Sequence, residues 1–168
     1  MKIVLYTGYH KTPWNPSFLD TIGLEGTEKT TYYLAKELAK LPGFQIWVVG
    51  NIIPGDFDGV KYRTTQRFKQ EESSVDTIIG ISYIHYIKEF KDFNYKNSIF
   101  WVHNTDYYTW WNGEEISNHR ELLSHPKLKH IICLTRWHRE VWLEQFPETK
   151  DKIKIIGHGI DIERLVNV

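Results

Sequence analysis

The stretch Lys2-Ile3-Val4-Leu5-Tyr6-Thr7 opens the chain and indicates the fold more directly than any other segment. Its mainly apolar residues do not alternate with polar ones, which is typical of a strand buried on both faces of a parallel sheet. A loop from Gly8 to Gly26 follows, and it is too long for an ordinary connection in a compact domain, so we expect it to have a functional role. Thr27 is then predicted to cap a helix that ends near Lys40.

Short apolar runs and helical patterns alternate along the rest of the chain. We expect further strands over 44–49, 60–64, 75–81, 98–102, 129–134 and 153–156, and further helices over 84–90, 114–124 and 135–146. Residues 54–56 are predicted to form a turn, and the polar segment 67–74 to be exposed. This alternation predicts one α/β domain over residues 1–168, a Rossmann-like parallel sheet with helices on both faces.

Composition excludes several functional classes. The chain has 21 basic and 21 acidic residues, so bulk charge does not attract it to nucleic acid or to an anionic membrane. No apolar stretch reaches the ~20 residues of a membrane-spanning helix. The lone Cys133 lies in an apolar run and is predicted to be a buried structural thiol, which fits a reducing compartment. We therefore expect a soluble cytoplasmic protein.

Ligands of open α/β sheets bind beyond the carboxyl ends of the strands. This rule selects three segments: the loop from Gly8 to Gly26, the segment that begins at His103, and the step Thr135-Arg136-Trp137. In the first, glycines precede a helix N-terminus, where free amides favour a phosphate group. A loop that merely turns the chain is the alternative.

His103 ends a strand and is followed by Asn104, Thr105 and Asp106. An imidazole in this position can bind a substrate hydroxyl or transfer a proton near neutral pH, or it can be a histidine satisfied within the rim of the sheet. The aromatic residues that follow can stack on the faces of sugar rings or pack on one another within the loop; they are Tyr107, Tyr108, Trp110 and Trp111.

Motifs for other chemistry are weak or missing. The chain has neither a dinucleotide-binding fingerprint nor a P-loop after its first strand. Asp56-Phe57-Asp58 has the spacing of a metal-binding pair of aspartates, but it lies in a turn before a strand, so a solvated acidic turn is favoured. The histidines of the C-terminal half show no metal-ligand spacing, and solvated or capping roles are predicted for them; they are His119, His125, His130 and His138. We expect no metal site and no cofactor.

The order of these pieces resembles the N-terminal domain of GT-B glycosyltransferases, above all the retaining family 4 group. Gly23 to Glu28 with the helix Thr27 to Lys40 is similar to the Gly-Gly-x-Glu loop and helix of that group. Trp101-Val102-His103 resembles its strand ending in histidine, and Ile131 to Trp137 resembles its strand ending in Ser or Thr. Ile155 to Asp161 is similar to its Pro-Asn-Gly-Val-Asp hinge.

The resemblance implies an enzyme that transfers a sugar from a nucleotide-sugar donor to a glycan or another hydroxyl acceptor, with retention and without a metal. His103 would contact the donor sugar as the catalytic residue. The residues implied to bind the donor phosphate or sugar are Gly23, Gly26, Thr27, Arg136 and His158. Those implied to bind the acceptor are Tyr9, His10, Trp14, Asn104, Asp106, Tyr107 and Trp110.

In that group the donor nucleotide is bound by a C-terminal domain, and we expect that domain to be absent from this chain. The resemblance therefore implies a half that needs a second domain or subunit for activity. A non-catalytic carbohydrate-binding module is the alternative, and a small-molecule-binding α/β domain of another kind is a weaker one.

Overall fold

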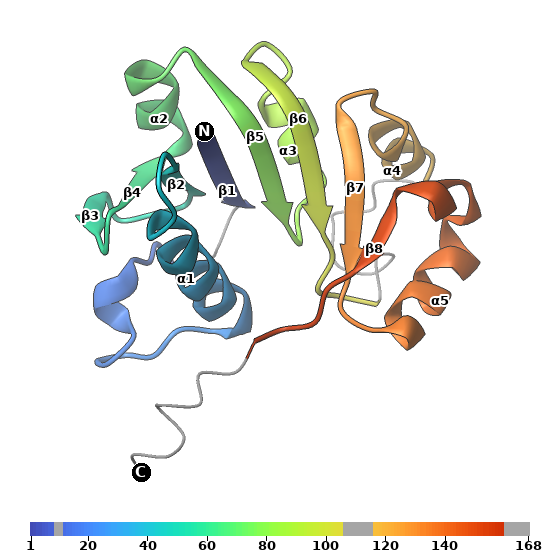
Figure 1. Cartoon of the computed structure of the whole chain (residues 1–168), viewed down its shortest axis with the longest axis horizontal. Helices are drawn as coiled ribbons and strands as arrows, with labels where there is room; N and C mark the ends of the chain where they lie inside the picture. Colours follow the sequence, from blue (N-terminus) through green and yellow to red (C-terminus); the bar gives the residue numbers. More distant parts are fainter. Residues whose placement is uncertain (9–11, 106–115, 160–168) are drawn as a thin grey trace.

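A single sheet of eight strands forms the centre of the protein in the computed structural model (Figure 1). The structure describes residues 1–8, 12–105 and 116–159, with the backbone alone for 116–118. The strands are β1 (Lys2–Gly8), β2 (Gln45–Gly50), β3 (Gly55–Phe57), β4 (Val60–Thr64), β5 (Ser74–Ile81), β6 (Asn94–Trp101), β7 (Leu128–Cys133) and β8 (Ile153–Ile155). Their order is β3-β4-β2-β1-β5-β6-β7-β8, and every pairing is parallel except that of β3 with β4. The predicted Rossmann-like α/β fold is confirmed.

The connections between strands contain the helices. They are α1 (Gly26–Ala39), α2 (Thr65–Glu71), α3 (Tyr86–Glu89), α4 (Ile116–Leu123) and α5 (Arg136–Gln145), with 3-10 turns η1 (Pro16–Phe18) and η2 (Pro147–Lys152). The segment 67–74 is largely exposed, as predicted, apart from the buried Phe68, and it forms most of α2 and the start of β5. Phe68 of α2 is fully buried and packs edge-on against Trp47 and Phe90, which supplies the apolar contact that holds so short a helix in place.

A turn was predicted over residues 54–56, and this prediction was wrong. Gly55 and Asp56 belong to β3, a short antiparallel edge strand beside β4. Arg63 of β4 holds this strand, since its guanidinium donates to the Gly55 carbonyl at 2.9 Å and to the Asp56 carboxylate at 2.7 Å. The edge is therefore fixed by a side chain of the neighbouring strand as well as by the ladder.

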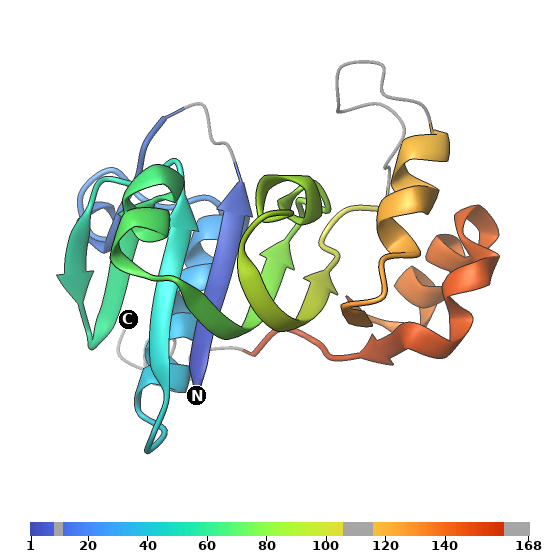
Figure 2. The same ribbon diagram turned by 90° about the horizontal axis from the view of Figure 1, so that it is seen from above.

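The two faces of the sheet have separate cores, and they are covered unequally. One core joins strand residues such as Val4 and Phe100 to Phe68 of α2, Ile87 of α3 and Trp142 of α5. The other joins Ile3, Leu5 and the far side of the remaining strands to Ala35 of α1 and to the loop that precedes it; its further members include Ile79, Trp101 and Ile132. Within the described ranges α1 is the only helix of this second core, and the arrangement of the helices can be followed in Figure 2.

The strand order reverses beside β1, which pairs with β2 on one side and with β5 on the other. After β2 the chain forms the edge strand β3, turns back to place β4 between β3 and β2, and then adds β5 on the opposite side of β1. The carboxyl ends of β1, β5 and β6 point to the same edge of the sheet, which the segment after β8 then crosses (Figure 1). We call this edge the carboxyl edge, and the general rule for open α/β sheets leads us to expect a ligand beside such a reversal.

The N-cap of α2 gives a first stability prediction. Thr64 Oγ1 accepts a hydrogen bond from the backbone N–H of Arg67 at 3.3 Å. Replacing Thr64 with alanine is expected to lower the free energy of unfolding by about 1 kcal/mol, measured by urea denaturation. Thr64→Ser, which keeps the hydroxyl, is the matched control and should retain most of that stability. Equal losses in the two variants would contradict a capping role.

Candidate functional site

His103 follows β6 at the carboxyl edge and lies against two other rings. Its ring centroid is 4.9 Å from that of Trp101 and 5.1 Å from that of His158, and both contacts are close to perpendicular. Trp101 and His158 are 5.6 Å apart and complete the group. We call Trp101, His103 and His158 the His103 cluster. Trp101 ends β6 and His103 lies two residues beyond it, whereas His158 belongs to the segment after β8.

The environment keeps the His103 imidazole uncharged at neutral pH. Burial, reinforced by the nearby His158 and His138, lowers the pKa of His103 from 6.5 to about 4. Burial also lowers the pKa of His158. A neutral imidazole has one donor and one acceptor nitrogen, so His103 is suited to a hydroxyl group rather than to the charge of a phosphate.

Some of the shielded polar atoms without a hydrogen-bond partner belong to strands that end at this edge. Among the described residues they include Thr7 Oγ1, Ser82 Oγ, Trp101 Nε1 and His103 Nε2. The four residues lie at the ends of β1, β5 and β6, and the Ser82 N–H donates to the Trp101 carbonyl at 2.9 Å. Unpaired buried polar groups are rare because each costs about 1–3 kcal/mol. Their accumulation at one edge is consistent with a place that receives the hydroxyls of a ligand.

Tyr83 connects this group of atoms to the start of α1. A Cβ on Gly8 would lie 2.4 Å from Tyr83 Cγ, so the ring covers the end of β1 closely, and Gly8 has a φ of +68°. Burial raises the pKa of Tyr83, and the charges of Glu28 and Glu25 raise it further. Tyr83 therefore lies between the end of β1 and the first turn of α1.

The start of α1 differs in detail from its prediction. The helix begins at Gly26, and Glu25 is the N-cap residue without a side-chain capping bond. The predicted cap, Thr27, lies inside the first turn instead, where its carbonyl accepts from Thr31 Oγ1 at 2.7 Å. Gly23 and Gly26 are exposed, and no atom lies within 4 Å of a Cβ built on either. The backbone of this turn is thus accessible to a ligand.

The other sequence-predicted site residues are dispersed. Arg136 is exposed at the first position of α5, and the Asn104 side chain is exposed after β6. Trp14 does not fit an acceptor-binding role, because it is only 2% exposed and packs edge-on against Tyr62 in the core. The remaining predicted residues lie outside the described ranges: Tyr9, His10, Asp106, Tyr107 and Trp110, with the neighbouring Tyr108 and Trp111.

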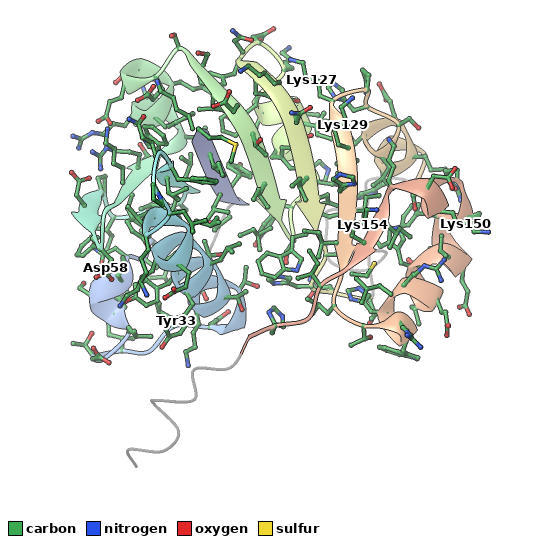
Figure 3. All side chains as sticks on the ribbon, in the orientation of Figure 1. Tyr33, Asp58, Lys127, Lys129, Lys150 and Lys154 are labelled. Atoms are coloured by element: carbon green, nitrogen blue, oxygen red, sulfur yellow. The ribbon has the colours of Figure 1, made fainter. Side chains whose placement is uncertain are left out.

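Four labelled lysines lie away from the start of α1, and the described residues do not form a metal site. Lys127, Lys129, Lys150 and Lys154 lie along the β7–β8 side of the molecule and away from α1 (Figure 3). In the part of the chain that the structure describes, no three His, Cys, Asp or Glu side chains are placed to hold a metal. Asp58 accepts from the Tyr32 hydroxyl at 2.9 Å, so the acidic turn has structural partners instead of being simply solvated.

Two other sequence predictions can be compared with the structure. Cys133 is buried, and burial raises the pKa of its thiol to about 11, as expected for a structural cysteine. Over the described ranges, no helix combines the length and apolar character needed to cross a membrane.

Sequence reasoning missed residues on either side of His103. Ser82 and Tyr83 directly follow the predicted strand 75–81, so the carboxyl-end rule would have selected them too. His138 was assigned a solvated or capping role, yet it is 3% exposed and its ring bonds to the backbone after β6. No local pattern signals that contact, because it joins α5 to a different strand.

The structure shows an α/β protein with a buried, uncharged histidine at the carboxyl edge of its sheet. The sequence matches no protein-family model, and no curated protein is significantly similar to it.

Proposed function

We propose that the carboxyl edge binds the sugar of a nucleotide-sugar donor and that the chain is the acceptor-side half of a GT-B glycosyltransferase. The supporting observation is the His103 cluster, with its shielded and unpaired polar atoms at the ends of β1, β5 and β6. The enzyme would transfer the sugar to a glycan or another hydroxyl acceptor with retention and without a metal ion. Its place of action in this proposal is the cytoplasm.

The chemistry of the cluster suits a neutral polyhydroxylated ligand. The Trp101 indole can only donate, the neutral His103 imidazole can donate and accept, and the Thr7 and Ser82 hydroxyls can do either. A sugar ring carries several hydroxyls that also do both, so such a ligand is chemically matched to these groups. Because His103 Nε2 is shielded, binding has to uncover it, and displacement of the exposed His158 ring is the most direct way.

The donor diphosphate would lie against the amides at the start of α1. The helix N-terminus and its accessible glycines favour an anion there. Glu25 and Glu28 in the same turn oppose it, and the lysines of the β7–β8 side lie elsewhere (Figure 3). Arg136 would offset part of the phosphate charge, and a C-terminal donor-binding domain or subunit would supply the rest.

NMR titration of the chain tests the donor site. Imidazole and indole resonances would be followed while UDP-glucose, GDP-mannose or free oligosaccharides are added. We expect a nucleotide sugar to shift the signals of His103 and Trp101, and His103→Gln to weaken binding about tenfold through the loss of one buried hydrogen bond. His130→Gln, at an exposed position of β7, is the control and should bind like the wild type. Signals of the His103 cluster that stay unchanged with every ligand would overturn the proposal.

A carbohydrate-binding module is the second candidate, and the neutral character of the His103 cluster favours it. Such a module should bind oligosaccharides as well as it binds nucleotide sugars. A half-enzyme should instead prefer the nucleotide sugar, and transfer should appear only when a donor-binding partner is added.

A further inference from the structure

His138 is buried on α5 and makes three hydrogen bonds with different parts of the chain. Its backbone N–H donates to Thr135 Oγ1 at 3.0 Å, which caps the helix. Its Nδ1 accepts from the backbone N–H of Leu134 at 3.2 Å. Because Nδ1 is an acceptor, the ring proton lies on Nε2, which therefore donates to the Asn104 carbonyl 3.2 Å away. The contacts fix both the orientation and the tautomer of the ring.

A second side chain of α5 holds the next carbonyl. Gln145 Nε2 donates to the Thr105 carbonyl at 3.0 Å. The two carbonyls that follow His103 are thus both bound from α5, at positions two helical turns apart. The Asn104 side chain itself is exposed. The hydrogen bonds from His138 and Gln145 therefore tie the backbone of this segment to α5.

We propose that His138 is a positioning residue, which in its neutral form holds the backbone after β6 and thereby keeps the His103 ring against Trp101 and His158. His138 itself makes no contact with a ligand in this proposal. The positioning stands on the hydrogen bonds alone. Only its consequence for sugar binding rests on the proposed function.

Two replacements separate the bonds of the ring. The amide oxygen of His138→Asn occupies the place of Nδ1 and can still accept from Leu134, but the side chain is too short to reach Asn104. The longer amide of His138→Gln reaches the place of Nε2 and can still donate to the Asn104 carbonyl. Both variants remove the imidazole charge equally, so a difference between them reports the bond to Asn104.

Thr149→Val is the matched control for lost stability. It removes the buried hydrogen bond from Trp142 Nε1 to Thr149 Oγ1, 2.9 Å, which lies between α5 and η2 and does not involve the segment after β6. Gln145→Leu removes the donor to the Thr105 carbonyl and leaves His138 in place. It provides a test even where His138→Asn fails to fold.

The measurements use ligand-free protein: the imidazole resonances of His103 across pH, and hydrogen exchange of the Val102 amide, which donates to the Ile132 carbonyl at 2.9 Å just before His103. In His138→Asn we expect the pKa of His103 to rise by at least about one unit and the Val102 amide to exchange faster. His138→Gln should remain closer to the wild type, Gln145→Leu should show a smaller change of the same sign, and Thr149→Val should show none.

Unchanged His103 signals in both His138→Asn and Gln145→Leu would overturn the proposal, and so would an equal shift in Thr149→Val. A separate titration with UDP-glucose then distinguishes the two ideas. If His103 moves in His138→Asn but no nucleotide sugar binds the wild type, positioning holds and the proposed function fails.

Discussion

Replacing Gly80 with alanine is expected to lower the free energy of unfolding by about 3 kcal/mol, the upper range for overpacking a core. A Cβ at this position of β5 would lie 2.0 Å from Cδ1 and 2.3 Å from Cε1 of Tyr86. Tyr86 is fully buried at the start of α3, in the same core as Phe90 and Phe100. The ring cannot move without displacing those neighbours, because protein interiors are close-packed. Urea denaturation measures the loss.

Two comparisons isolate this clash. Gly26→Ala adds the same methyl group where no atom lies within 4 Å, so it is expected to change stability by less than about 1 kcal/mol. In the double variant Gly80→Ala with Tyr86→Leu, the smaller side chain makes room for the methyl group. Its loss should therefore be clearly smaller than the sum of the two single losses. Simple additivity would show that the ring of Tyr86 does not oppose a side chain at position 80.

Acidification from pH 6.5 to pH 4 is expected to destabilise the protein by about 3 kcal/mol through His103 alone. Its pKa is about 4 in the folded protein, mainly because of burial, and His158 and His138 are the titratable groups that face it. The unfolded chain takes up the proton near pH 6.5, whereas the folded chain does so only near pH 4. The stabilisation is therefore complete above pH 6.5 and is lost as pH falls through this window.

The contribution of His103 is measured by comparing the wild type with His103→Gln. Urea denaturation of both proteins at pH 7.5 and pH 4.5 gives the difference in slope. The variant should lose less stability on acidification, although His138, His158 and His125 still contribute with the same sign, since their pKa values are also lowered. Parallel pH profiles would show that His103 is not protected from protonation in the folded protein.

The fold could be predicted because its strands are buried on both faces. Lys2–Thr7 contains the unbroken apolar run Ile3 to Tyr6, and 75–81 is rich in Val and Ile; each is a strand in the structure. The elements that were missed are short and polar. The helix α2 depends on the tertiary contacts of Phe68, and β3 depends on the hydrogen bond from Arg63. Neither element has a local residue pattern from which its secondary structure could be predicted.

The candidate site could be predicted only in part. His103 stands at a strand end, and the rule for parallel sheets places it correctly at the carboxyl edge. Trp14 looked like a ligand-binding aromatic in a polar loop, but the Ile53 N–H donates to its carbonyl at 2.9 Å and the loop folds back into the core. The hydrogen bond between His138 and the Asn104 carbonyl joins residues that are distant in the sequence, and no pattern of residue spacing predicts such a contact.

The reversal beside β1 also bears on how the chain folds. Strands β1 to β4 pair within the first 64 residues, and β5 to β8 pair within residues 74–155, so each half closes through comparatively short loops. Among the strand pairings of the described residues, that of β1 with β5 alone joins the halves, and the Lys2 N–H, which donates to Asp76 at 2.8 Å, reinforces it. Because loop-closure entropy disfavours pairing between residues so far apart in the sequence, we expect β1 to dock on β5 late in folding. Under the proposed function, the sugar site would therefore be complete only when the two halves meet.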